Sequence, residues 1–385
     1  RIGDLFGYRN AIIVGVLIFA TGSLIGGIAQ HWVWIDVGRI IQGAAAGLVY
    51  PNSTSLVLAS MPENRKGLGM GVLAAVIGAS LAVGMLLGGF LTTYVSWRVV
   101  FLVNVPLGII VALACALLLQ NQRSNTEGKL DWMGSFLLIL ALGALVLGLN
   151  QLPEHTVLHK YVLVLFIISG LTFILFSFHQ NMTAHGILPK ALMNNTHFIL
   201  GCVMRLMTVM PFYLVLFVFG LYVQQNLSLN AFQAGLVFLP MTLAIAGFST
   251  WGGRLIDRLG AAATVKLSAV FYALSFLLML FSLHHLTMVV LACILILIGV
   301  AFALASPGAL AFSFQGVHDH MRGSASGVFY MLSVCGGLLA VAISSTVLSA
   351  MNTSATHISM HGVQYLLLGG MVLNAATFVI ARDAK

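Results

Sequence analysis

The stretch RIGDLFG occupies residues 1–7, and a similar stretch, RLIDRLG, occupies residues 254–260 with arginine, aspartate and glycine in the same register. A second pair of similar stretches, KGLGMGV at 66–72 and RGSASGV at 322–328, shares a basic residue, two glycines and a valine. Nearly the same interval of sequence separates the members of each pair. We therefore expect one internal duplication, in which each half carries one copy of a charged turn.

The composition excludes a water-soluble globule. Of 385 residues, 60% are hydrophobic and 7% are charged, which leaves too few polar side chains to cover a soluble domain. Apolar runs long enough to cross a hydrocarbon core of ~30 Å as helices recur throughout the chain. The sequence therefore predicts an all-α membrane protein with about twelve spans. These lie at 11–30, 33–57, 68–91, 99–119, 132–150, 161–178, 198–223, 231–250, 264–283, 286–306, 323–350 and 363–381.

The basic residues are distributed unevenly between alternate loops. With the first loop assigned to the cytoplasm, most of the 17 lysines and arginines fall on the cytoplasmic side, and only Arg98 and Lys160 fall outside. Such a bias sets the orientation of membrane proteins. It predicts a multi-pass protein of the cytoplasmic (inner) membrane, in contact with the lipid bilayer, with residue 1 and the C-terminus in the cytoplasm. It also explains the net charge of +8 without a nucleic-acid partner.

Two long polar interruptions, at 120–132 and around 179–197, divide the chain. They separate an incomplete N-terminal bundle of four spans (1–119), two linker spans (120–185) and a C-terminal bundle of six spans (186–385). Within its bundle the second charged turn follows two spans, whereas the first follows none. If the halves are duplicates, we expect two further spans upstream of Arg1, in about 50 to 60 residues. The chain would then be an N-terminally truncated part of a fourteen-span protein.

Each charged turn suits a contact at a helix end. Asp4 or Asp257 can face the positive N-terminal end of a neighbouring helix, and Arg9 or Arg258 can close the charge pair. Glycine allows the tight loop between two antiparallel helices. The alternative is an ordinary positive-inside loop with a turn glycine. The candidate gating residues are Asp4, Gly7, Arg9, Gly253, Asp257, Arg258 and Gly260.

Polar residues inside two spans are candidates for a central cavity. Asp36, Arg39 and Gln42 recur at intervals of three, which predicts one helical face with a protonatable and polar site. The alternative is a self-neutralised pair near the membrane interface. Arg205 has no acid within one helical turn, and it either lines the same cavity or snorkels to the cytoplasmic surface. No Ser/His/Asp set, HExxH or CxxC is present, so we expect no enzyme, cofactor or metal site.

Several short stretches resemble the major facilitator superfamily. The two charged turns resemble its loop signature, RIIQG at 39–43 resembles its fourth-helix signature, and GMLLGG at 84–89 resembles its antiporter signature in the fifth helix. More specifically, four stretches are similar to the fourteen-span drug:proton antiporter branch. These are WRVVFLVNVPLG at 97–108, LDWMG at 130–134, LYVQQ at 221–225 and AGLVFLP at 234–240.

The resemblance implies two six-helix bundles joined by two extra helices, with a central cavity that opens alternately to each side. It implies export of small amphipathic, often cationic drugs in exchange for protons, and it leaves room for a periplasmic adaptor protein. Gly84, Gly88 and Gly89 would form the antiporter-type motif, with Met85 in place of the usual proline. Alternatives are a metabolite or siderophore exporter and, outside the class, a membrane sensor or scaffold that moves nothing.

Overall fold

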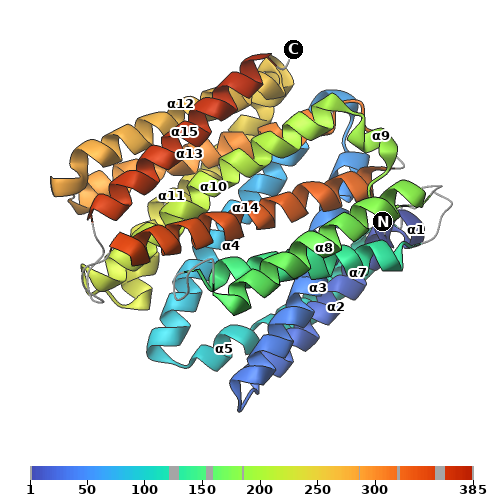
Figure 1. Cartoon of the computed structure of the whole chain (residues 1–385), viewed down its shortest axis with the longest axis horizontal. Coiled ribbons are helices and arrows are strands. Elements are labelled where there is room, and N and C mark those ends of the chain that lie inside the picture. Colours follow the sequence, from blue (N-terminus) through green and yellow to red (C-terminus); the bar gives the residue numbers. More distant parts are fainter. Residues whose placement is uncertain are drawn as a thin grey trace.

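The computed structural model describes residues 2–120, 130–152, 159–183, 186–285, 287–318, 321–351 and 360–383. Throughout these ranges every regular element is a helix (Figure 1), which confirms the all-α expectation. Arg1 and Lys385, for which the charge pattern predicts a cytoplasmic location, lie outside the described residues.

The helices follow one another without any intervening strand in the described part of the chain. They are α1 (Ile2–Phe6), α2 (Tyr8–Gly27), α3 (Trp32–Ser60), η1 (Glu63–Arg65), α4 (Lys66–Tyr94), α5 (Trp97–Leu102), α6 (Asn104–Leu118), α7 (Trp132–Asn150), α8 (Lys160–Met182), α9 (Lys190–Met193), α10 (Thr196–Gln225), α11 (Ala231–Leu259), α12 (Ala261–Ser282), η2 (Leu283–His285), α13 (Met288–Ser313), α14 (Arg322–Met351) and α15 (Met360–Asp383).

Among the described residues, 11 helices are long and apolar enough to cross a membrane, with α5 and α6 together forming one of them. The sequence predicted one more span, at 33–57. The helix at that place, α3, is 29 residues long but is not among the 11. Asp36, Arg39 and Gln42 in its first half and Asn52 and Ser53 in its second half lower its mean hydropathy. The length of α3 still equals that of α4, which is also 29 residues long.

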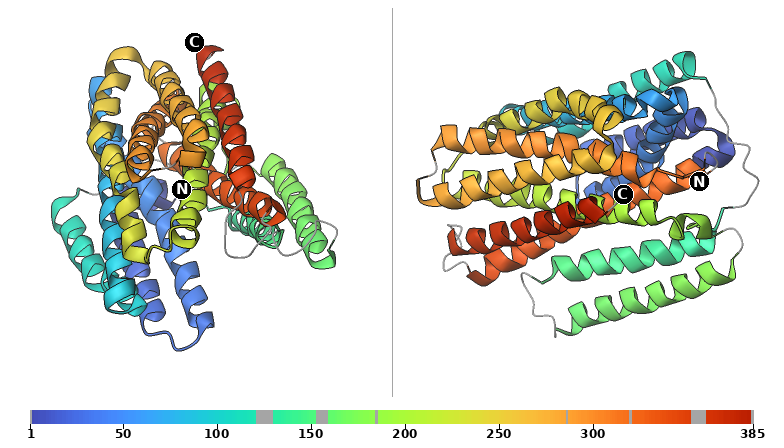
Figure 2. Two further views of the ribbon diagram at one scale, coloured as in Figure 1. Left: turned by 90° about the vertical axis from the view of Figure 1, so that its left-hand side faces the viewer. Right: turned by 90° about the horizontal axis from the view of Figure 1, so that it is seen from above.

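Most helices of the first half (1–119) and of the second half (186–385) pack on helices of the same half. Helix α4 of the first half instead packs chiefly on α11 of the second. In the first half α2 packs on α3 and α6, and in the second half α13 packs on α10, α11 and α12. The most extensive helix contact in the described structure joins α4 to α11, one helix from each half. Helices α7 and α8 pack on each other and lie side by side at the edge of the molecule (Figure 2).

Glycines allow the backbones of α4 and α11 to approach closely. A Cβ atom built on Gly71 would lie 2.5 Å from the carbonyl oxygen of Ser249, and one on Gly89 would lie 2.7 Å from the carbonyl oxygen of Ala231. On the other helix, a Cβ on Gly253 would lie 2.4 Å from the carbonyl oxygen of Gly67. Close backbone packing of this kind drives helix association in lipid, where burial of apolar side chains contributes little.

We expect Gly71→Ala to lower the free energy of unfolding by about 1–3 kcal/mol, because its methyl group would collide with the backbone of α11. Gly88→Ala is a matched control on the same helix, since nothing lies within 4 Å of its Cβ position. Thermal denaturation of both variants in detergent measures the difference. Equal stability of the two variants would show that the close approach is unimportant.

Candidate functional site

Asp257 in the last turn of α11 caps the N-terminus of α4. Its Oδ1 accepts a hydrogen bond from the backbone N–H of Gly67 (2.8 Å), and its Oδ2 accepts one from the N–H of Leu68 (2.9 Å). The first N–H groups of a helix have no partner within the helix and carry partial positive charge, so a carboxylate there is favourable. One side chain of the second half thereby holds a helix of the first half.

Asp4 has the equivalent place at the N-terminus of α14. It is fully buried and accepts a hydrogen bond from the hydroxyl group of Tyr8 (3.1 Å). A Cβ atom built on Gly323 would lie 2.4 Å from Asp4 Oδ1, so the carboxylate rests directly on the first turn of α14. A side chain of the first half thus contacts a helix of the second half.

The two repeated stretches of the sequence therefore meet crosswise. The turn at 254–260 contacts the stretch at 66–72, and the turn at 1–7 contacts the stretch at 322–328. We call the end of the molecule where these contacts lie the turn end. Both pairs of similar sequences belong to one symmetrical closure of that end.

Two glycines shape the turns themselves. Gly7, between α1 and α2, has φ of 92°, and Gly260, between α11 and α12, has φ of 87°. Residues other than glycine rarely adopt these values. Gly253 acts differently: because it lacks a side chain, α4 can come close enough for Asp257 to reach Gly67.

The expected pairing of these aspartates with Arg9 or Arg258 is not found among the described residues. Arg9 donates a hydrogen bond to the carbonyl oxygen of Ala116 in α6, and Arg258 is exposed. Asp257 instead accepts hydrogen bonds from two backbone N–H groups, and Arg258, the next residue in the helix, points about 100° away from it. The prediction of a charge pair was therefore wrong, whereas the predicted contact with a helix N-terminus is present.

The polar residues of α3 divide between two faces. Asp36 and Arg39 are exposed, and no ion pair joins them in the described part of the chain. Gln42 is buried; its Nε2 donates to Ser23 Oγ of α2 (2.6 Å), and its Oε1 accepts from Arg39 Nη1 (3.4 Å). Since each helical residue advances by about 100°, a spacing of six places Gln42 on a different face from Asp36. A role for these residues in substrate binding stays a prediction.

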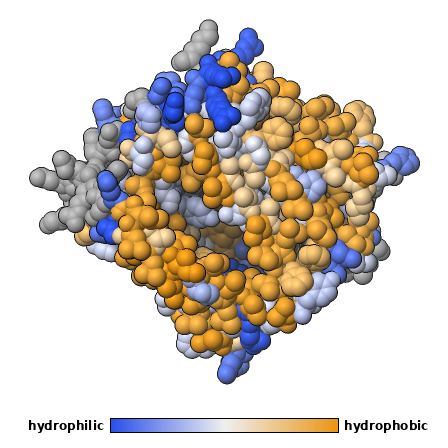
Figure 3. Space-filling model, turned by 180° about the vertical axis from the view of Figure 1, so that it is seen from behind, coloured by the Kyte–Doolittle hydropathy of each residue, from blue (hydrophilic) through white to orange (hydrophobic). Residues whose placement is uncertain are grey.

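The exposed face of α3 continues from Asp36 toward the C-terminus of the helix. Gly43 and Gly47 have open space within 4 Å of their Cβ positions, and Tyr50 is half exposed, so an exposed stripe runs along this face of the helix. The face of the molecule seen in Figure 3 is hollowed at its centre. The residues that line this hollow are less hydrophobic than the residues of the surface around it. The surrounding apolar surface is what a lipid-facing protein requires.

Arg205 of α10 is buried, with 7% of its surface exposed, and does not snorkel. Its Nε donates to Ser333 Oγ of α14 at 2.7 Å. The guanidinium carbon lies 5.5 Å from the ring centre of Phe302 and 5.4 Å from that of Phe329. Its Nη1 is buried without a hydrogen-bond partner.

A further contact between the halves was not predicted. Thr54 Oγ1 of α3 and the Tyr330 hydroxyl of α14 lie 2.8 Å apart, and Ser55 Oγ and Ser326 Oγ lie 3.1 Å apart. Ser326 also donates to the carbonyl oxygen of Pro51 (3.1 Å). Small hydroxyl residues are frequent at helix interfaces in membranes, so the serines and threonines of these two spans were the available signal.

The three glycines of the antiporter-type motif, Gly84, Gly88 and Gly89, differ in their surroundings. Gly89 packs against Ala231 of α11, whereas Gly84 and Gly88 have open space at their Cβ positions. Met85 does not interrupt α4, which runs as one helix, and its carbonyl oxygen lies beside Gly235 of α11.

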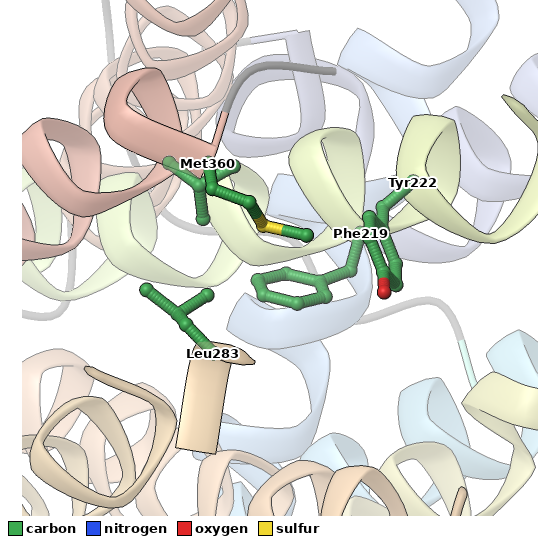
Figure 4. A pocket seen from close by; sticks show the side chains of 5 residues that line it. Phe219, Tyr222, Leu283 and Met360 are labelled. Atoms are coloured by element: carbon green, nitrogen blue, oxygen red, sulfur yellow. The ribbon is translucent and has the colours of Figure 1, made fainter. Parts of the chain in front are cut away.

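One apolar pocket lies at the opposite end of the second half. Phe219, Tyr222, Leu283, Met360 and Val363 line it, and Figure 4 shows the side chains packed closely around it. It leaves no room for a water molecule and therefore belongs to the core of that half.

These features define a multi-span helical membrane protein whose two repeated halves close against each other at one end. The family model of the Major Facilitator Superfamily matches residues 1–341, and the chain belongs to this superfamily of transporters.

Relatives include proteins named for antibiotic resistance. The chain is 30% identical to the puromycin resistance protein pur8 of Streptomyces alboniger, over 94% of this chain and 72% of that protein. It is 28% identical to the tetracenomycin C resistance and export protein of Streptomyces glaucescens, over 71% of this chain but only about half (51%) of that protein's length. The crystal structure of the human organic anion transporter MFSD10 (TETRAN) has the same fold, with a TM-score of 0.65 and 17% identity over 98% of this chain and 78% of that one.

The capping contact of Asp257 gives a direct prediction. Asp257→Asn keeps the size of the side chain but removes its charge, so we expect a shift of about 1 kcal/mol toward the state in which the turn end is open. Cysteine cross-linking across the turn end should weaken and turnover should fall, while equilibrium substrate binding survives. Arg258→Gln, on the exposed neighbour, is the control. Loss of substrate binding in folded Asp257→Asn protein would place this aspartate in the binding site itself.

Proposed function

We propose that this transporter exports small amphipathic compounds across the cytoplasmic membrane in exchange for protons, by alternating access. The crosswise contacts of Asp4 and Asp257 carry the proposal, because they close one end of the molecule through interactions that break when the two halves separate. Resistance and export proteins among the relatives support the direction of transport and the drug-like class of substrate.

The moving parts are the bundles at 1–119 and 186–385. The excess of basic residues at the turn end supports its location in the cytoplasm. The structure then represents a state that is closed toward the cytoplasm. The α7–α8 pair at 120–185, which lies at the edge of the molecule, supports assignment to the fourteen-span branch.

Asp36 is the residue that we assign to proton coupling. It lies inside the long helix α3, one turn after the first residue Trp32, whereas the other described carboxylates lie in short helices or at helix ends. These are Asp4, Glu63, Asp131, Asp257 and Asp383. Ionisable residues inside membranes are retained for proton relays and substrate paths. Asp36 is exposed and lies near the end of α3 that is remote from the turn end, and in this proposal it exchanges protons with the outer side when the turn end is closed.

The test is export of a fluorescent dye by the full-length chain in vesicles with an imposed proton gradient. A difference of one pH unit releases about 1.4 kcal/mol per proton, which supports about tenfold accumulation. We expect Asp36→Asn to abolish this accumulation while downhill movement continues, and Asp36→Glu to retain it. Export by the unaltered protein that persists after a protonophore would exclude proton coupling. An Asp36→Asn variant that still accumulates dye would exclude Asp36 as the proton carrier.

A further inference from the structure

Arg205 carries a buried positive charge that no carboxylate neutralises within the described residues. The described acidic residues of the second half, Asp257 and Asp383, lie at the ends of helices α11 and α15. Arg205, in contrast, is the tenth residue of the 30-residue helix α10. Its partners are a serine hydroxyl group and two aromatic rings. None of these groups carries a full negative charge.

This arrangement is unfavourable unless something else binds the cation. Removal of a guanidinium group from water is strongly unfavourable, and one neutral hydrogen bond and two ring faces offset only part of that cost. The buried Nη1 group leaves donor capacity unused. A residue that only filled space here would be more stable as an uncharged side chain of similar volume.

The location of Arg205 links it to the interface that must open during transport. Its partners Ser333 and Phe329 belong to α14, and the adjacent Tyr330 hydrogen bonds to Thr54 of α3. The ring centre of Tyr330 also lies 5.8 Å from that of Tyr50. Tyr50 is the residue of the exposed stripe nearest to the C-terminus of α3. Movement of α14 away from α3 would therefore uncover the guanidinium group toward the path between the halves.

We propose that Arg205 binds a carboxylate, or a similar planar anionic group, of the transported compound. The proposal rests on the export function inferred above and specifies its substrate class as amphipathic organic anions. Guanidinium groups pair with carboxylates through two parallel hydrogen bonds, and the Phe302 and Phe329 rings provide an apolar wall for the rest of the molecule. A substrate that brings the missing negative charge would be favoured over the cationic compounds that the family resemblance implied.

Two xanthene dyes of opposite charge test the proposal with the full-length chain: fluorescein, which carries a carboxylate, and rhodamine 123, a cation in which this group is esterified. We expect tighter binding of fluorescein than of rhodamine 123. Arg205→Gln should weaken fluorescein binding by about tenfold to a hundredfold and leave rhodamine 123 binding unchanged. Arg205→Lys should retain part of the affinity, and Ser333→Ala, which removes a neutral partner, should change it less than either.

Thermal stability distinguishes a ligand-binding arginine from a structural one. We expect Arg205→Gln protein to be at least as stable as the unaltered protein without dye, and fluorescein to stabilise only the unaltered protein. Destabilisation of Arg205→Gln, or equal loss of both dyes, would show that another part of the protein pairs with the arginine and would overturn the proposal. Proton-driven export of rhodamine 123 without any binding of fluorescein would also overturn it, while leaving the export function intact. Absence of proton-driven export of either dye would count against the export function itself.

Discussion

A carboxylate at the N-terminus of a helix in the opposite half is the interaction on which the closed end of this protein depends. The hydrogen bonds from Gly67 and Leu68 to Asp257 require α4 and α11 to lie almost in backbone contact. That distance in turn requires glycine at 67, 71 and 253. Capping, packing and the orientation of the two halves are thus one geometric condition, met in equivalent form at Asp4 and Gly323.

Sequence patterns predicted the helical class, the positions of 11 of the twelve expected spans and the contact of each aspartate with a helix end. They did not predict which helix each aspartate would cap, because internal similarity relates the halves without saying how they pack. The predicted pairing with Arg9 and Arg258 was wrong for a related reason, because sequence motifs do not show which backbone groups lie nearby. Asp257 accepts from the backbone N–H groups of Gly67 and Leu68, and Arg9 donates to the carbonyl oxygen of Ala116.

The polar residues inside spans show a second limit of sequence reasoning. A spacing of three residues suggested a shared face for Asp36, Arg39 and Gln42, yet Gln42 lies against Ser23 of α2. For Arg205, sequence allowed both a cavity and a surface location, because it lies in the cytoplasmic part of the predicted span 198–223 and long basic side chains extend toward the membrane surface. Only the packing of Phe302, Phe329 and Ser333 around it distinguishes the two.

The crosswise pattern at the turn end has the form of an isologous interface. Residue i of one half meets residue j of the other, and residue j of the first meets residue i of the second, as in a two-fold symmetric dimer. Two identical copies of one half could therefore make both contacts at once, before any covalent link existed between them. The closure needs no difference between the halves, so sequence divergence elsewhere could specialise one half for protons and the other for cargo without disturbing it.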